Sequence, residues 1–249
     1  MDVRRREMTA SYRFAAGLLR PLMRTITRRD WQGADNLPRS GGFVVCPNHI
    51  SYADPLTVAH FLFDNGQLPR FLIKDSLFQL PVLQRIFRGA GQIPVYRGTS
   101  DAQRAYSAAV AAVRAGECVV IYPEATLTRD PGLWPMRGKT GAARVALETG
   151  RPVIPVAQWG AQHVLAPYGK VPHLLPPRQV VVHAGKPVDL SRFQGRRLDG
   201  LLLQEVTGVI LDELTAMLAE IRSETPPATR WNPRLHGQPA TGNPKGRNR

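Results

Sequence analysis

The chain alternates apolar runs with segments of helical spacing from Trp31 onward, and this alternation restricts its possible folds more than any other feature. Short apolar runs of strand length are separated by stretches whose apolar residues recur with the period of a helix. Parallel strands joined by helical crossovers produce this pattern. We therefore predict an α/β fold with a mixed, largely parallel central sheet flanked by helices. The expected strands lie near 43–47, 70–74, 91–96, 117–122, 152–157 and 179–184, and the expected helices near 53–63, 101–115, 138–149 and 198–222.

This α/β domain is expected to span residues 31–222, since 249 residues with 43% apolar composition can bury one large core. After Ser223 the composition changes to Pro, Gly, Asn and Arg, so residues 223–249 are predicted to form a disordered basic tail. Cys46 and Cys118 lie inside apolar runs and are expected to be buried, reduced thiols.

Residues 9–29 combine apolar and basic positions at helical spacing. Pro21 is expected to kink this helix or to split it into a pair. A basic amphipathic helix either lies in a membrane interface or packs on its own domain. The arginines favour the interface, because lipid phosphates are anionic, and we predict that residues 1–30 form amphipathic membrane-association helices.

The formal net charge of +14 suits either nucleic acid or an anionic membrane surface. The chain has no recognisable nucleic-acid-binding motif and no aromatic-basic stacking surface, so no nucleic-acid partner is expected. No run reaches the ~18 apolar residues of a spanning helix, and the N-terminus lacks the apolar core of a signal peptide. The sequence thus predicts a peripheral protein on the cytoplasmic face of the cell membrane.

A His and an Asp follow the first apolar run at a spacing suited to acid–base chemistry. The run from Pro47 to Pro55 contains His49 and Asp54, five positions apart. An imidazole can take a proton from an alcohol when a carboxylate holds its other ring nitrogen in the required tautomer. Two other interpretations remain open: the two side chains only satisfy each other, or Ser51 and Asp54 cap the following helix.

Four segments follow expected strands, where an open α/β sheet gathers its ligands. They are Asn48–Asp54, Gly91–Arg97, Ile121–Arg129 and Pro152–Ala157. In this order they resemble the blocks of the glycerolipid acyltransferase family that includes the 1-acyl-sn-glycerol-3-phosphate acyltransferases. That family is marked by an Asn-His-x-Ser-x-x-Asp block, a block ending in Arg, a Pro-Glu-Gly-Thr block and an apolar block with a central Pro.

The resemblance runs from about Trp31 to about Ser191, and the stretch from Thr126 to Gly141 is similar to the actinobacterial branch. It implies that His49 is the general base and that Asp54 orients it. The acceptor hydroxyl would attack an acyl thioester directly, so no acyl-enzyme, bound cofactor or metal is expected. His60 matches no helical metal-ligand spacing with the dyad.

The resemblance also implies an acceptor site. Arg97 would bind the acceptor phosphate, its alternative being a surface Arg at the end of an edge strand. Glu124 and Thr126 would position the acceptor, with Glu124 bonded to Arg97 or to a glycerol hydroxyl. Lys74 either contacts the thioester donor or is a plain strand-end lysine.

Two positions depart from the family pattern. Ala125 stands where the family usually has Gly, which is strained if the backbone there needs a positive φ. Leu127 stands where many members have Arg, so one phosphate-binding cation is missing from its usual place. Arg129 or Lys139 are the candidates to replace it.

The function that the resemblance implies is transfer of a fatty acyl group from acyl-CoA or acyl carrier protein to the free hydroxyl of lysophosphatidic acid, giving phosphatidic acid. Acylation of glycerol 3-phosphate, or of another lysophospholipid or glycolipid, is the alternative that the departure at Leu127 keeps open. A basic nucleic-acid-binding protein is the alternative from another class, supported by charge alone.

Overall fold

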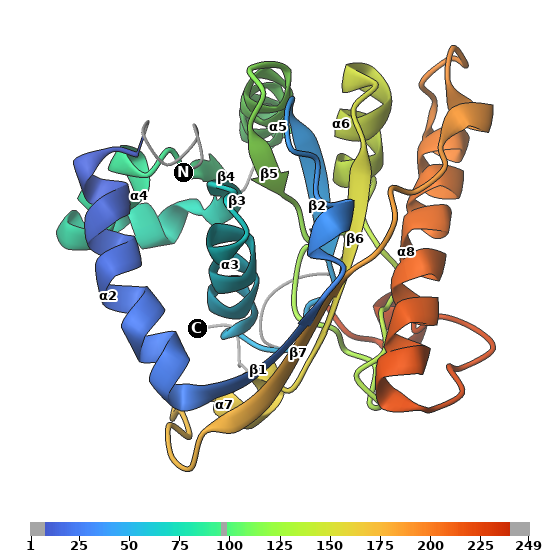
Figure 1. The fold of residues 1–249 in the computed structure, drawn as a ribbon. Coiled ribbons are helices and arrows are strands. Elements are labelled where there is room, and N and C mark those ends of the chain that lie inside the picture. The colour runs from blue at the N-terminus through green and yellow to red at the C-terminus, as the bar shows by residue number, and fades with distance from the viewer. Residues whose placement is uncertain (1–7, 96–98, 240–249) are drawn as a thin grey trace.

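The structure is a computed structural model that describes residues 8–95 and 99–239 (Figure 1). Its strands form one seven-stranded sheet in the order β1-β7-β6-β2-β5-β3-β4 within the described residues. Every neighbouring pair is parallel except β6 and β7. The predicted mixed, largely parallel sheet is therefore confirmed. The strands are β1 (Thr27–Gln32), β2 (Phe43–Pro47), β3 (Pro69–Lys74), β4 (Ile93–Val95), β5 (Cys118–Val120), β6 (Val153–Trp159) and β7 (Arg178–Ala184).

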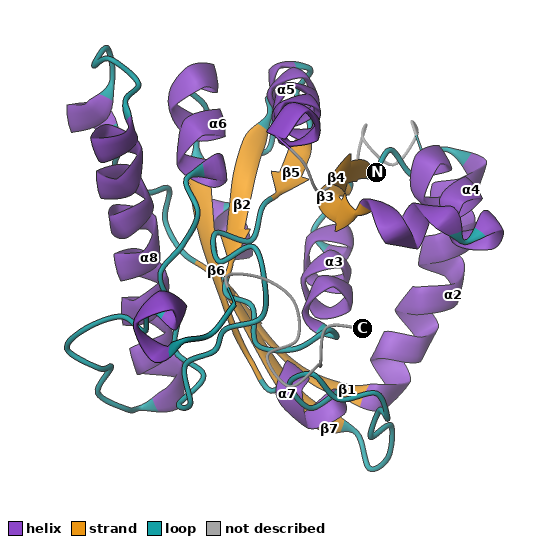
Figure 2. Cartoon of the chain, turned by 180° about the vertical axis from the view of Figure 1, so that it is seen from behind, coloured by secondary structure: helices purple, strands orange, loops and turns teal. Residues whose placement is uncertain are grey.

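Helices cover both faces of the sheet. Helices α2 and α3 pack on one face, with α4 against α2, whereas α5, α6 and α8 cover the other face (Figures 1 and 2). The described helices are α2 (Ala10–Ile26), α3 (Asp54–Asp64), α4 (Pro81–Gly89), α5 (Thr99–Arg114), α6 (Gly141–Thr149), α7 (Ala161–Val164) and α8 (Gly200–Arg222). Single 3₁₀ turns lie at Ala34–Asn36, Asp75–Gln79, Ser191–Phe193 and Pro233–His236.

The central strand β2 explains why its sequence is an uninterrupted apolar run. Phe43 and Val45 belong to the core beneath α2 and α3, whereas Val44 and Cys46 belong to the core beneath α5, α6 and α8. A strand buried on both faces has no polar alternation. Cys46 and Cys118 are free and buried, as expected, and they lie in the two opposite cores.

The N-terminal segment differs from the expected helix over 9–29. Helix α2 ends at Ile26, and Thr27–Gln32 forms β1, paired in parallel with β7. This strand was not predicted because its sequence, Thr-Arg-Arg-Asp-Trp-Gln, lacks apolar alternation. Helix α2 passes through Pro21 as a single helix and is not split into a pair.

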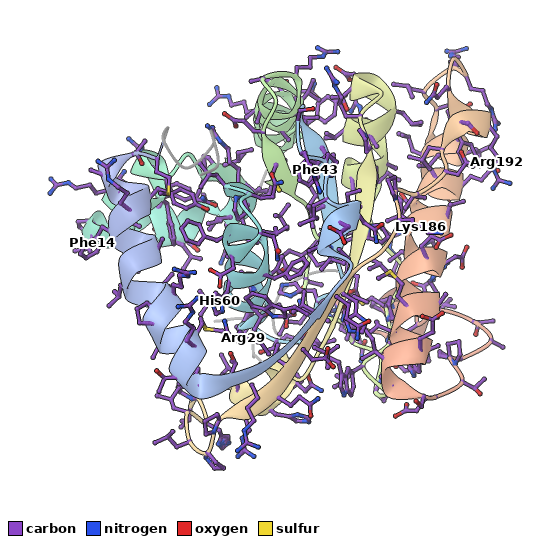
Figure 3. The ribbon with its side chains drawn as sticks, viewed as in Figure 1. Phe14, Arg29, Phe43, His60, Lys186 and Arg192 are labelled. Carbon is purple, nitrogen blue, oxygen red and sulfur yellow. The ribbon has the colours of Figure 1, made fainter. Side chains whose placement is uncertain are left out.

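Helix α2 packs on the domain with one side and exposes the other. Met23 and Ile26 are buried, whereas Phe14, Leu18 and Leu22, spaced four residues apart, are 62%, 62% and 43% exposed. Phe14 points away from the domain (Figure 3). No helix of the described ranges is both long enough and apolar enough to cross a bilayer.

Several arginines assigned to lipid phosphates have a partner within the protein. Arg20, Arg24 and Arg29 converge on Asp64 at the end of α3, at nitrogen–oxygen distances of 2.5, 3.4 and 3.8 Å. Burial lowers the pKa of the neighbouring His60 to about 4. The pairs of Arg20 and Arg24 attach α2 to α3, and that of Arg29 attaches β1 to α3, so this part of the basic segment contributes to the fold.

The segment after Ser223 also differs from the expected disordered tail. Residues 226–239 turn back along α8 (Figure 1), where Trp231 stacks on His236 with ring centroids 3.5 Å apart. Arg230 bonds Asp212 of α8, and the backbone N–H of Arg137 donates to the carbonyl of Trp231 at 2.9 Å. A polar segment with few large apolar residues is thus held by hydrogen bonds and ring stacking. Residues 240–249 lie outside the described ranges.

Candidate active site

His49 and Asp54 meet at the carboxyl end of β2. The Nδ1 atom of His49 lies 2.9 Å from Oδ2 of Asp54, which is hydrogen-bond distance. Because a carboxylate only accepts hydrogen bonds, this contact places the ring proton on Nδ1 and leaves the lone pair on Nε2. The His49 side chain is 14% exposed, so its ring is reachable from the surface.

Asp54 is held as an acceptor by the turn that carries His49. Its side chain is fully buried, and Oδ2 also accepts hydrogen bonds from the backbone N–H groups of Ile50 and Ser51 at 2.6 and 2.8 Å. Burial raises the pKa of Asp54, while the hydrogen bonds from His49, Ser51 and Ile50 oppose that shift. The carboxylate therefore has one orientation, fixed by three donors.

Helix capping, which the sequence left open, does not account for these residues. The N-cap of α3 is Ala53, and no side chain caps it. Ser51 instead donates its hydroxyl to the carbonyl of Leu165 at 2.6 Å and accepts from the N–H of Ala53 at 3.0 Å. Ser51 thereby ties the dyad turn to the end of α7.

The residue before the base is clamped to the next strand. The Asn48 amide exchanges two hydrogen bonds with the backbone of Gln158 on β6, at 3.1 and 2.8 Å. The Gln158 side chain returns one to the Asn48 carbonyl at 3.1 Å and accepts the Thr57 hydroxyl at 2.6 Å. All three side chains are buried. Gln158 was not predicted as a site residue, and its only sequence signal is a polar side chain inside an otherwise apolar strand.

Glu124 holds the backbone of the loop that carries His49. Its Oε1 accepts the backbone N–H of His49 at 2.9 Å, and its Oε2 accepts that of Met136 at 3.0 Å. Sequence reasoning had Glu124 bonded to Arg97 or to a glycerol hydroxyl. In the structure both carboxyl oxygens hold backbone amides and the residue is 1% exposed, so it braces the loop that carries His49.

The remaining residues of this loop divide into an exposed and a buried set. Ala125 is exposed and adopts φ 58°, the left-handed region, so the strain expected for a residue other than Gly is present. Thr126 is half-buried beside it. Leu127 is 1% exposed, and its carbonyl accepts the Tyr168 hydroxyl at 3.1 Å. The backbone N–H of Thr128 donates to the His49 carbonyl at 2.7 Å.

The predicted cations are distributed around the site. Arg129 is buried, whereas Lys139 is exposed and its N–H donates to the carbonyl of Pro123, next to Glu124, at 2.7 Å. Lys74 is exposed at the carboxyl end of β3. Arg97 lies outside the described residues, so its predicted phosphate contact stays a prediction.

Tyr122, another residue missed in the sequence, packs on the base. Its ring is stacked on that of His49, with centroids 4.1 Å apart and planes 28° apart. The stacked ring and the Nδ1 contact to Asp54 together restrict rotation of the imidazole. The site can therefore present a fixed Nε2 lone pair to a hydroxyl, which is what general-base catalysis requires.

A first prediction concerns the protonation of Glu124. Burial raises the pKa of Glu124 to about 8, against hydrogen bonds from Met136, His49 and Thr128. Because the folded state holds this proton and the unfolded chain releases it at a lower pH, the stability contributed at Glu124 falls as pH rises from about 4.5 to 8. We expect Glu124→Gln to be less stable than wild type at pH 5, because the Gln amide nitrogen cannot accept one of the two backbone N–H groups, and to lose less stability than wild type between pH 5 and pH 8. Urea unfolding at both pH values measures this difference, and a constant loss at both would show an ionised Glu124.

A profile of the Acyltransferase family matches residues 28–159. The chain is 31% identical over 140 residues to "1-acyl-sn-glycerol-3-phosphate acyltransferase BAT2, chloroplastic" of Brassica napus, covering 55% of this chain and 39% of that protein. It is 29% identical over 134 residues to a 1-acyl-sn-glycerol-3-phosphate acyltransferase of Borreliella burgdorferi, covering 53% of this chain and 51% of that protein. The match thus spans about half the length of these relatives, or less.

A solved structure shares the fold. The crystal structure of the 1-acyl-sn-glycerophosphate (LPA) acyltransferase PlsC from Thermotoga maritima superposes with a TM-score of 0.62, covering 87% of this chain and 83% of that one at 21% sequence identity. At this identity the likeness establishes the fold alone. The family profile covers more than half of the chain and includes His49, Asp54 and Glu124. The resemblance inferred from the sequence is therefore confirmed, and the chain belongs to the Acyltransferase family.

Proposed function

We propose that this protein transfers a fatty acyl group from an acyl thioester, on CoA or acyl carrier protein, to the free hydroxyl of lysophosphatidic acid. The observation that carries the proposal is the contact between His49 Nδ1 and Asp54 Oδ2, which leaves Nε2 to take a proton from a hydroxyl. Family membership and the names of the relatives from Brassica napus and Borreliella burgdorferi support this choice of reaction.

The proposed step needs no enzyme nucleophile. The acceptor oxygen attacks the thioester carbonyl carbon while its proton passes to Nε2 of His49, and Asp54 stabilises the resulting imidazolium. The new oxygen–carbon bond forms, the carbon–sulfur bond breaks, and the thiolate leaves and recovers the proton. Among the described residues, both cysteines are buried in strands of the sheet, and burial raises the pKa of the Cys46 thiol well above its ordinary value.

The acceptor is tested by direct competition. Purified protein is given one labelled acyl-CoA together with lysophosphatidic acid, glycerol 3-phosphate or a lysophospholipid that has a larger head group. The proposal expects phosphatidic acid as the main product. If glycerol 3-phosphate or the lysophospholipid with the larger head group is acylated preferentially, that compound and not lysophosphatidic acid is the acceptor.

We further propose that the protein works at the cytoplasmic face of the membrane, held there by α2. The acceptor's acyl chain resides in the bilayer, and the exposed stripe of Phe14, Leu18 and Leu22 offers an apolar surface to it. Arg13 on α2 and Arg28 on β1 are both exposed and would attract anionic head groups.

A second prediction tests this anchor by point substitution. Removing residues before Asp30 would also remove part of β1 and the buried Met23 and Ile26, so a shortened chain would confuse folding with binding. Phe14→Ser with Leu18→Ser leaves the packed side intact. Burying one such side chain is worth about 1.5–3 kcal/mol, so we expect the double variant to bind anionic vesicles at least about tenfold more weakly.

The control is Leu201→Ser, because Leu201 is 79% exposed on α8, which covers the opposite face of the sheet. Flotation with anionic and neutral vesicles over a salt series is the measurement. Binding of the control is expected to equal wild type and to weaken with salt. Equal flotation of the double variant and wild type would place the anchor elsewhere, with the segment from Leu77 to Phe87 as the next candidate.

A further inference from the structure

A cavity of about 230 Å³ is lined in part by Glu124 and Met136. Three parts of the chain that are far apart in sequence enclose it: the loop before α6, one residue of α8, and the segment that turns back after α8. Its lining residues are Glu124, Met136, Arg137, Gly138, Lys139, Thr140, Gln204, Asn232, Pro233 and Arg234.

Three of the lining side chains are cations without an ion-pair partner. Arg137, Lys139 and Arg234 line the cavity, and in residues 8–95 and 99–239 none of them has a carboxylate within 4.0 Å. Some other arginines of the described residues are paired, as in the cluster on Asp64 and in the contact of Arg230 with Asp212. Like charges repel at close range unless an anion lies between them, so this cavity is suited to a negatively charged ligand.

Among the described lining residues, Glu124 is the single carboxyl group, and its two oxygens are bonded to the backbone N–H groups of His49 and Met136. Burial raises the pKa of Glu124, which favours its neutral form. Three cations line the cavity with this one carboxyl group, so the net charge facing the cavity is positive.

Residues 226–239, which turn back along α8, form one side of this cavity and are held in place by hydrogen bonds. The carbonyl of Trp231 accepts the backbone N–H of Arg137 at 2.9 Å, which joins the segment to the loop before α6. Asn232 accepts the N–H of Arg234 through its side chain at 3.2 Å, and Pro233 is buried. These contacts hold Arg234 on the same cavity as Arg137.

The cavity is connected to His49 by the hydrogen bonds of Glu124. Glu124 accepts the His49 N–H with one oxygen and the N–H of Met136, a lining residue, with the other. A single carboxyl group therefore separates the cavity from the backbone of His49. A charged group bound here would therefore be linked to the backbone of His49 through the hydrogen bonds of Glu124.

We propose that this cavity binds a phosphate group of one of the two substrates, held by Arg137, Lys139 and Arg234. The inference rests on the proposed function, because it takes its ligand from that reaction. Guanidinium groups bind phosphate oxygens in pairs, and a volume of about 230 Å³ accommodates a phosphate or pyrophosphate while the rest of the substrate lies outside it. The phosphate belongs either to the carrier end of the acyl donor or to the glycerol phosphate of the acceptor.

Binding measured without turnover tests the site. Adenosine 3′,5′-bisphosphate represents the CoA donor and glycerol 3-phosphate the acceptor, and each is titrated calorimetrically into the full chain at constant ionic strength. We expect one probe to bind, and Arg137→Gln and Arg234→Gln each to weaken it by about tenfold or more, since each removes a charge-assisted hydrogen bond. The KM of the corresponding substrate should rise in the same variants.

Lys186→Gln is the control, since Lys186 is exposed, lies outside the cavity lining and carries the same charge as the two arginines (Figure 3). It should leave affinity and KM unchanged. Failure of both probes to bind, or equal weakening by Lys186→Gln, would overturn the inference. If a probe binds as expected but no thioester is consumed, the proposed reaction fails while the phosphate site stands. If turnover is normal and both arginine variants keep wild-type affinity and KM, the cavity is not a substrate site.

Discussion

His49→Ala should lower turnover by at least about 10²-fold, the lower end for a general base, while the protein remains folded. The imidazole is the group in the described site that can accept the hydroxyl proton, because Asp54 is fully buried and both oxygens of Glu124 hold backbone amides. The substitution removes the ring but not the backbone N–H that Glu124 binds. We therefore expect a loss in kcat with little change in thermal stability.

The matched control is His163→Ala, because His163 is an exposed histidine on α7 and takes no part in the dyad contacts. It should retain wild-type turnover. Steady-state kinetics with lysophosphatidic acid and one acyl-CoA, together with a melting curve for each variant, measure the effect. A folded His49→Ala protein with near-normal turnover would remove His49 from the mechanism.

Asp54→Asn should reduce turnover by about tenfold or more, a smaller loss than removal of the base. The amide oxygen can keep the N–H groups of Ile50 and Ser51, so the turn is preserved. The negative charge that stabilises the imidazolium of His49 is lost, and this charge matters most in the transition state. The loss should therefore fall on kcat, with little change in KM for either substrate.

The split between kcat and KM separates an electrostatic role from a purely structural one. If Asp54 only supported the turn, the variant would lose thermal stability and its KM values would rise. An unchanged kcat would contradict the proposed role of the carboxylate. The double variant His49→Ala, Asp54→Asn gives the second check, because a residue that acts through His49 adds little further loss once His49 is absent.

The parts of this protein that sequence predicted correctly depend on local or periodic patterns. The strand β2 is buried on both faces, so its run of four apolar residues predicts a strand directly. His49 and Asp54 lie within one turn after that strand, so their contact needs no distant part of the chain. The family blocks were recognisable because each follows a strand that has its own apolar signal.

The tertiary structure decided the elements whose stability comes from distant partners. β1 is a polar hexapeptide that becomes a strand because its edge pairs with β7, a strand about 150 residues away along the chain. Glu124 became a brace because Met136 and His49 present amides to a buried carboxyl group. No periodicity in the sequence encodes either arrangement.

The clamp on Asn48 and the cavity beside Glu124 have the same origin. Asn48 and Gln158 are 110 positions apart, and each polar group is satisfied only because parallel β2 and β6 are neighbours in the sheet. Arg137 and Arg234 share one cavity because the segment after α8 turns back and hydrogen-bonds the loop before α6. Apolar periodicity determined which segments form helices and which form strands, since burial acts on every residue of a run. Long-range hydrogen bonds and the placement of charges depend on which segments become neighbours. Only the assembled sheet, with the segment that turns back along α8, determines those neighbours.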